Sequence, residues 1–168
     1  MATETVKSGS ITSRDTVPID FMEAVLAAGN IKVAVGTVEM GVADIGSKYI
    51  MCEVPSNAVI HLVEISSDTA IVAALADIGI YQTTQNGGAV VDADFFGSAV
   101  DVSTAALSNS RVEHESAVYG IEDVEKPLWE ALGLASDPAR MYDVVATTTV
   151  AATTGGTFSL RVWYTTSQ

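Results

Sequence analysis

The residues best suited to acid–base chemistry in this chain are its two histidines. His61 lies inside the apolar run Ala58–Ile65, so we expect it to be a packed or edge residue of a strand. His114 lies within Arg111–Ser116 (RVEHES), with a carboxylate on either side and a serine two residues later. Neighbouring residues of an extended segment point to opposite sides, so this spacing does not build a Ser-His-Asp arrangement. We expect His114 to lie in a solvated acidic loop.

A pair of carboxylates that cleaves glycosidic bonds is the next candidate. Six acidic residues lie close together in the sequence: Glu113, Glu115, Glu122, Asp123, Glu125 and Glu130. Nothing in their spacing brings two of them to the two sides of one cleft. We therefore expect a solvated face, or a face that meets a basic partner, and an enzyme is the least favoured interpretation.

Two segments resemble ligand-binding loops only in part. Gly41–Lys48 (GVADIGSK) has the composition of a phosphate-binding loop, but its lysine follows the serine instead of preceding it, which predicts a turn. Asp92–Gly97 (DADFFG) opens like a calcium loop, but Phe96 stands where a third oxygen ligand belongs. A calcium site that combines its two aspartates with distant groups stays open as an alternative. Our prediction is a chain without metal or other cofactor.

Composition narrows the function classes further. The chain carries 21 acidic and 8 basic side chains, a formal net charge of −13, which disfavours nucleic acid and anionic membranes as partners. Only 17% of its 168 residues are charged and 48% are apolar, so we expect part of the surface to face other protein. Cys52 is the only cysteine, which excludes an intrachain disulfide. Neither a signal peptide nor a membrane span is expected, and we predict synthesis in a cytoplasm.

The elements that must position these residues are mainly strands. Turns of glycine, proline and asparagine separate strand-length runs rich in β-branched residues, and Asn86-Gly87-Gly88 is the strongest hairpin signal. Short helices are expected from Asp20 and at Pro127–Leu132. The pattern predicts a mainly β fold, either a single-domain β-sandwich (jelly-roll-like) or a small barrel, with one or two short helices. The predicted strands are Ile31–Met40, Tyr49–Val54, Ala58–Ile65, Ala70–Gln82, Ala89–Val91, Tyr142–Ala152 and Thr157–Thr165.

The last predicted strand also gives a prediction of side-chain direction. Every second residue from Phe158 to Tyr164 is apolar, which is typical of a strand with one face on a core. Arg161 and Trp163 then point away from that core, and Trp163 is equally suited to an interface and to ordinary packing. We interpret Gly155-Gly156 as the turn of a hairpin that joins this strand to Tyr142–Ala152.

Two further segments are expected to reach beyond the core. Residues 1–20 are rich in serine and threonine and predict an extended N-terminal arm, with residues 21–168 as a single β-rich domain. Residues 97–120 are weakly patterned and predict a long surface excursion. Trp129, in the second short helix, is expected to anchor the core. The candidate interface residues are Ile11, Val17, Phe21, Met22, Arg161 and Trp163.

Six segments follow one another in a distinctive order: Ala76–Tyr81 (ADIGIY), Gly87–Phe96 (GGAVVDADFF), Leu128–Leu134 (LWEALGL), Asp137-Pro138, Tyr142-Asp143 and Gly155–Tyr164 (GGTFSLRVWY). In this order the chain resembles a group of small virion proteins of tailed bacteriophages that are encoded near the major capsid protein. The resemblance covers roughly residues 30–165 and leaves out the arm. It implies a capsid decoration or cement protein of the virion surface, with the major capsid protein as its partner and no catalytic residues.

Given this resemblance, we expect a homo-oligomer, a trimer first and a dimer next. The negative charge repels packaged DNA and so favours the outside of a shell. Two other classes stay open. One is a tail, neck or fibre-attachment component of the virion. The other is a carbohydrate-binding β-sandwich that uses Trp163 and the Asp92/Asp94 loop.

Overall fold

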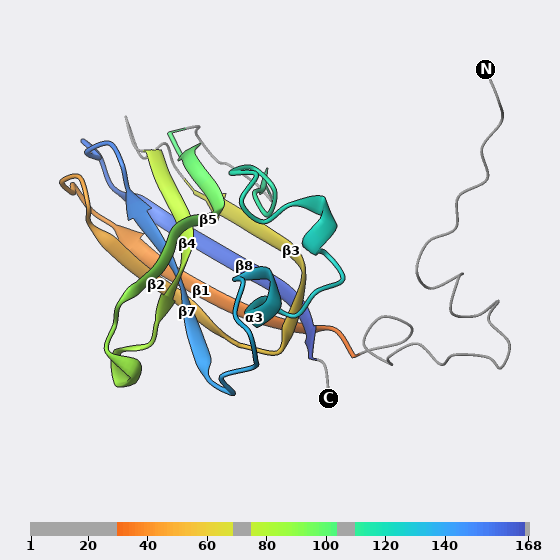
Figure 1. Ribbon diagram of the computed structural model, residues 1–168. Helices are drawn as coiled ribbons and strands as arrows, with labels where there is room; N and C mark the ends of the chain where they lie inside the picture. Colours follow the sequence, from red (N-terminus) through yellow and green to blue (C-terminus); the bar gives the residue numbers. More distant parts are fainter. Residues whose placement is uncertain (1–29, 69–74, 104–109, 167–168) are drawn as a thin grey trace, which may run out of the picture.

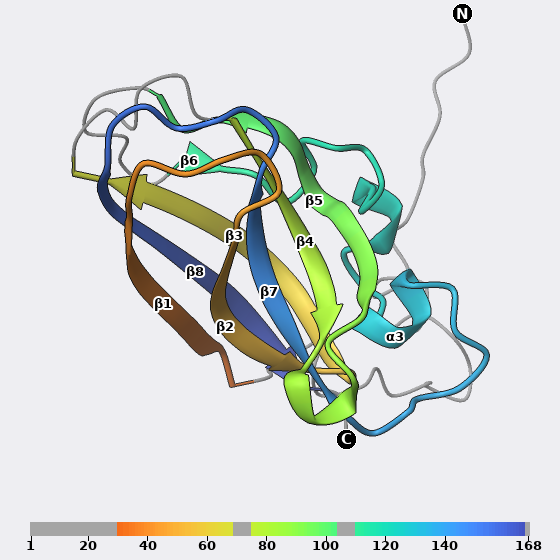
Figure 2. The same cartoon turned by 90° about the vertical axis from the view of Figure 1, so that its left-hand side faces the viewer.

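Two four-stranded antiparallel sheets pack face to face in the computed structural model, which describes residues 30–68, 75–103 and 110–166 (Figures 1 and 2). One sheet has the strand order β1-β8-β3-β6 and the other β2-β7-β4-β5, which is the order of an eight-stranded jelly roll. The β-sandwich prediction is therefore confirmed in its jelly-roll form, and the barrel alternative is not. The strands are β1 (Lys32–Met40), β2 (Lys48–Pro55), β3 (Ala58–Ser67), β4 (Leu75–Gln82), β5 (Val90–Asp101), β6 (Ser110–Arg111), β7 (Met141–Thr148) and β8 (Gly156–Thr166).

The core lies between the two sheets and is built by side-chain alternation along each strand. In β8, Phe158, Leu160 and Val162 are fully buried, whereas Arg161 and Trp163 are only partly buried. Because successive side chains of a strand point to opposite faces, Arg161 and Trp163 lie on the outer face of their sheet, as predicted. The facing sheet contributes the same kind of alternating apolar residues, among them Ile78, Ile80, Val144 and Ala146.

Only one pair of consecutive described strands, β4 and β5, lies side by side in a sheet. The turn between them contains the short 3-10 helix η1 (Thr84–Asn86), and Gly87 and Gly88 follow with φ of 100° and 64°. These positive angles explain why the Asn-Gly-Gly signal identified a true hairpin. The other turns carry the chain from one sheet to the other.

The predicted hairpin at Gly155-Gly156 is therefore wrong. β7 pairs with β2 and β4, whereas β8 pairs with β1 and β3 in the opposite sheet. Glycines at a turn indicate that the chain reverses, but they do not say which sheet receives the next strand.

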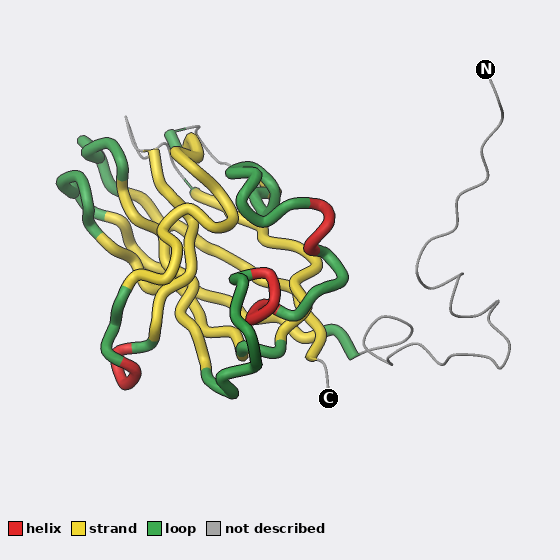
Figure 3. The backbone as a smooth tube through the Cα atoms, in the orientation of Figure 1, coloured by secondary structure: helices red, strands yellow, loops and turns green. Residues whose placement is uncertain are grey.

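The helical segments are short (Figure 3). The helix α3 (Leu128–Ala131) begins after Pro127, as predicted, but Leu128 is its fully buried residue and Trp129 is only partly buried, so the core anchor was assigned to the wrong neighbour. The 3-10 helix η2 (Ile121–Asp123) precedes it. No helix in the described ranges is long and apolar enough to cross a membrane. The arm at 1–20 and the helix expected from Asp20 lie outside the described residues.

Candidate interaction surfaces

The first candidate surface is the outer face of the β1-β8-β3-β6 sheet. Strand pairing aligns Trp163 with Val33 of β1 on one side and with Leu62 of β3 on the other, so that an apolar row crosses three strands. Val33 is 42% exposed although it is apolar. The adjacent row places Arg161 between Val35, 55% exposed, and Glu64. We call these six residues the outer sheet face.

Trp163 has an unusual position on the outer sheet face. Its indole nitrogen is buried and has no hydrogen-bond acceptor within the part of the chain that the structure describes. A buried polar group without a partner costs about 1–3 kcal/mol, so most such groups in native proteins are paired. Trp163 therefore packs on the outer face of its sheet, and its indole N–H lacks a hydrogen-bond acceptor among the described residues.

The second candidate surface is the segment 112–127, which runs from β6 to α3 and closes the side of the sandwich between β3 and β5. The backbone N–H groups of Ser116 and Tyr119 donate to the carbonyl oxygens of Phe96 and Phe95 in β5. On the β3 side, the backbone N–H of Val112 donates to the Val63 carbonyl. Of the long surface excursion that the sequence predicts at 97–120, residues 97–101 belong to β5 and residues 104–109 lie outside the described residues. Residues 112–120 are hydrogen-bonded to β3 and β5.

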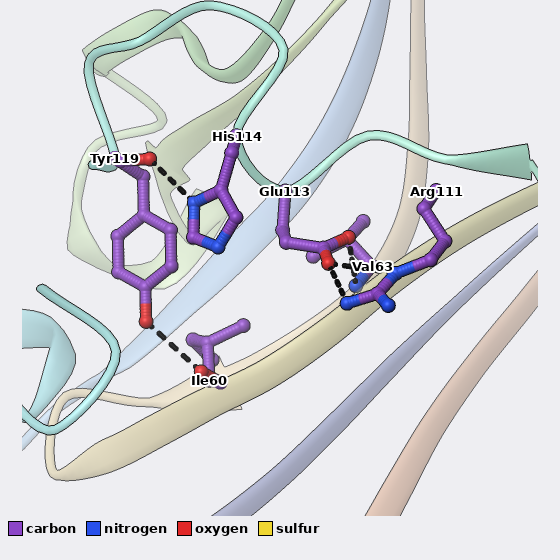
Figure 4. A network of polar contacts seen from close by, with 6 residues as sticks. All are labelled: Ile60, Val63, Arg111, Glu113, His114 and Tyr119. Carbon is purple, nitrogen blue, oxygen red and sulfur yellow. Dashed lines mark hydrogen bonds and ion pairs between the residues drawn. The ribbon is translucent and has the colours of Figure 1, made fainter. Parts of the chain in front are cut away.

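Tyr119 fastens this segment to the core. Its side chain is 1% exposed and packs against the rings of Phe95 and Phe96, with centroids 5.5 and 5.6 Å away. Its hydroxyl donates to the carbonyl oxygen of Ile60 at 2.9 Å (Figure 4) and lies 3.3 Å from that of Asp123. Burial, with Asp123 and Glu113 nearby, raises the pKa of Tyr119 well above its usual value, so the hydroxyl remains a donor.

Glu113 and His114 serve this same fastening (Figure 4). Glu113 is 3% exposed, pairs with Arg111 and accepts a hydrogen bond from the backbone N–H of Val63. The His114 ring stacks on Tyr119 with its plane tilted by 6°, and its Nδ1 lies 2.8 Å from the Tyr119 carbonyl oxygen. The expected solvated acidic loop is therefore wrong for these two residues, since their polar groups hold the segment onto the sandwich.

Other acidic side chains of the cluster also have local partners. Asp123 accepts from the backbone N–H of Gly120 and pairs with Lys126 at 2.7 Å, and Glu115 accepts from the backbone N–H of Ser98. These contacts cap backbone groups and hold turns in place. They do not set two carboxylates across a cleft, which glycosidic cleavage requires.

The remaining chemical candidates are separated from one another. Asp94 donates its backbone N–H to the Asp92 carboxylate in β5, and burial together with a hydrogen bond to Asp94 raises the pKa of Asp92. No group of three metal-ligating side chains occurs within residues 30–68, 75–103 and 110–166. Because β5 lies in one sheet and Trp163 in the other, the structure does not bring together the two parts of the proposed carbohydrate site.

Two further reactive side chains, His61 and Cys52, lie apart from these surfaces. His61 lies at a bulge of β3 with Nε2 3.0 Å from the Thr165 hydroxyl. Since β3 lies between β8 and β6 and His61 is exposed, His61 is neither packed in the core nor on an edge strand, contrary to the expectation from the sequence. Burial, with Asp143 and Glu53 nearby, raises the pKa of Cys52 to about 12, so its thiol is protonated and a poor nucleophile.

Sequence reasoning missed one group of surface residues, the apolar side chains of Val118, Ile121 and Val124. All three are exposed, and Ile121 is 75% exposed. Their signal in the sequence was three apolar residues at intervals of three inside an acidic segment.

Comparison with known proteins bears on the fold. Neither a protein-family model nor a curated protein matches the sequence. Among solved structures, a chain of the capsid of Ralstonia phage GP4 aligns with a TM-score of 0.59 and 15% identity over 84% of this chain and 87% of that one. A chain of the cyanophage Pam1 capsid asymmetric unit aligns with a TM-score of 0.50 and 17% identity over 82% and 86%.

This chain has the fold of two phage capsid chains. The resemblance that the six sequence segments indicate is thereby confirmed at the level of the fold. Jelly rolls also occur in lectin domains, so function must be argued from surfaces rather than from topology.

Proposed function

We propose that this chain is a non-enzymatic structural protein of a bacteriophage virion, which binds the outside of the capsid and stabilises it by bridging capsid subunits. The observation that carries the proposal is the alignment with two phage capsid chains, which spans more than four-fifths of this chain and of each of them. The ordered sequence segments that resemble capsid-associated virion proteins support the same role.

Charge supports a position on the outer surface of the shell. A net charge of −13 repels packaged DNA, which fills the inside of a capsid. The major capsid protein is the proposed partner. Each copy buries apolar side chains across the seam between subunits, and binding to the assembled shell alone stabilises that shell by mass action.

The outer sheet face is the proposed contact between copies of this chain. Its apolar row is a group of adjacent side chains, unlike the single exposed apolar residues that are common on protein surfaces. Trp163, at the centre of the row, is of a residue type that often contributes most of the binding energy of an interface. The proposed assembly is a homotrimer, with a dimer as the next choice.

The N-terminal arm, residues 1–20, is proposed to contact a neighbouring subunit through Ile11 and Val17. Phe21 and Met22, at the start of the domain, are proposed to take part in the same contact. All of these lie outside the described residues. Deleting residues 1–18 should leave the melting temperature of the domain unchanged and weaken its binding to capsids. A truncated chain that binds capsids like the full chain would remove the arm from the proposal.

The deciding experiment is the native mass of the purified chain, measured alone and after mixing with bare capsids. A trimer that co-sediments with shells and raises their disruption temperature supports the cement function. A ring of five, six or twelve copies that does not coat shells indicates a tail or neck position. A monomer that ignores shells contradicts the proposal.

A further inference from the structure

The segment 118–124 presents apolar side chains on a rigid base. Val118 is 45%, Ile121 75% and Val124 37% exposed, and they lie within seven residues of one another. Tyr119, between them, is anchored in the core, and the backbone N–H of Asp123 donates to the Gly120 carbonyl. A surface held in one conformation before binding loses little conformational entropy when it docks. We call these three exposed side chains the Ile121 knob.

Backbone strain beside the knob points the same way. Ala117 has a φ of 60°, a left-handed conformation that costs a non-glycine residue about 1 kcal/mol or more. The hydrogen bond from the Val118 N–H to the Ser116 hydroxyl, which itself donates to the Phe95 carbonyl, maintains this turn. The fold thus supports a strained turn whose result is to hold Val118 outward.

Charge decides the kind of partner. Around the knob, Glu115, Glu122 and Glu125 are exposed, whereas the nearest cation, Lys126, is paired with Asp123. The whole chain has 21 acidic side chains against 8 basic ones. A second copy would therefore bring mainly like charge to this rim, and a partner with lysine or arginine around an apolar pocket would bring opposite charge.

We propose that the Ile121 knob inserts into an apolar pocket rimmed by basic side chains on a protein other than this chain. The partner is a subunit of the shell, so this inference rests on the proposed function. It adds a second contact, on the β3–β6 side of the sandwich, to the contact between copies that we propose through the outer sheet face. A bridging protein requires two such separate surfaces.

The test compares the binding of full-length variants to bare capsids by co-sedimentation over a range of protein concentrations. Ile121→Ser removes the centre of the knob, and Glu122→Lys reverses one rim charge. Ile45→Ser is the matched control, because Ile45 is 69% exposed and lies between β1 and β2, at the opposite edge of the sandwich from β6. Thermal melts confirm that all variants are folded.

We expect Ile121→Ser to weaken binding about tenfold or more, and Ile45→Ser to leave it unchanged. Glu122→Lys should weaken binding most at low salt, since salt screens its repulsion from a basic rim. The native mass of each variant should stay that of the wild type, because the knob does not join copies of the chain.

Three results would overturn the inference. If Ile121→Ser binds capsids as strongly as the wild type, the knob is not a contact with the shell, and the proposed function is unaffected. A lower native mass for Ile121→Ser makes the knob a contact between copies. If the wild type itself does not bind capsids, the proposed function is contradicted, and so is the inference that the knob binds a shell subunit.

Discussion

At the scale of single residues, two glycines allow neighbouring strands to approach each other closely. A methyl group at Gly79 of β4 would overlap the backbone of Asp92 and Ala93, where β5 bulges across its neighbour. A methyl group at Gly36 of β1 would overlap the backbone of Met51 in β2, at the edge where the two sheets meet. Backbone atoms cannot rotate out of the way as side chains do, so neither position tolerates a side chain without a shift of a strand.

Gly79→Ala should therefore lower the free energy of unfolding by about 1–3 kcal/mol, the usual cost of overpacking, and the melting temperature by several degrees. Gly41→Ala is the control, because a methyl group there meets nothing within 4 Å. Thermal melts followed by circular dichroism measure both. A Gly79→Ala protein as stable as Gly41→Ala would show that β5 does not pass so close to β4.

Asp143 gives a pH-dependent prediction. It lies opposite Glu53 in the β2–β7 pair, and burial, followed by repulsion from Glu53, raises its pKa above 3.8. The raised pKa means that folding disfavours the carboxylate, so Asp143 costs stability at neutral pH. This cost disappears as the pH falls through the raised pKa and the folded protein takes up the proton.

Asp143→Asn should accordingly raise the melting temperature at pH 8 by about 1–2 °C and by less at pH 4, where more of the Asp143 carboxyl group is protonated. Asp44→Asn makes the same charge change at an exposed turn and serves as the control. An equal gain for Asp143→Asn at both pH values would contradict the burial and repulsion that we assign to the carboxylate.

At the scale of elements, most strands were predictable, whereas the β4–β5 hairpin was the one strand pairing that the sequence identified. β1, β2, β3 and β8 begin and end within two residues of the predicted runs, because alternation of apolar residues and turn residues are local signals. The assignment of β7 and β8 to different sheets depends on contacts between residues far apart in sequence. The direction of Trp163 followed from alternation along β8 alone.

Segment 112–127 shows the same limit. Its buried residues Val112, Glu113, Tyr119 and Asp123 lie in no strand or α-helix, so no strand or helix pattern marked them as internal. Their positions depend on β3 and β5, which they join. The Ile121 knob was hidden for the same reason, since its exposure results from the burial of Tyr119.

Tyr119→Phe tests how this segment is held. The change keeps the ring and removes the hydrogen bond to the Ile60 carbonyl, so we expect a loss of about 1–2 kcal/mol in the free energy of unfolding. Cleavage between residues 112 and 127 in limited proteolysis should become faster. Tyr49→Phe is the control, because no hydrogen bond of the Tyr49 hydroxyl is found among the described residues. Unchanged stability and cleavage would show that the hydroxyl does not hold the segment.

At the scale of the whole molecule, the inner face of β8 contributes to the stability of the chain, whereas its outer face is the proposed contact between copies. Leu160 points into the core and is fully buried, whereas Trp163 lies on the outer sheet face. Trp163→Ala should lower the native mass of the assembly and change the melting temperature of the chain only slightly. Leu160→Ala should do the opposite and cost about 2–5 kcal/mol of stability.

Analytical ultracentrifugation and thermal melts of both variants decide this prediction. If Trp163→Ala unfolds the chain while any folded fraction assembles normally, Trp163 belongs to the core of the monomer. The contact between copies would then have to lie elsewhere on the molecule.

The antiparallel pairing of β1 with β8 also determines where the described chain enters and leaves the sandwich. Lys32 at the start of β1 lies opposite Tyr164 near the end of β8, and the Lys32 ammonium donates to the Thr166 hydroxyl at 3.2 Å. A linker of a few residues should therefore join Thr166 to Lys32 without disturbing either sheet, and new ends can be opened at the exposed Gly87-Gly88 turn. Such a circular permutant would carry a fused peptide at the β4–β5 turn of the β2-β7-β4-β5 sheet instead of beside β1 and β8.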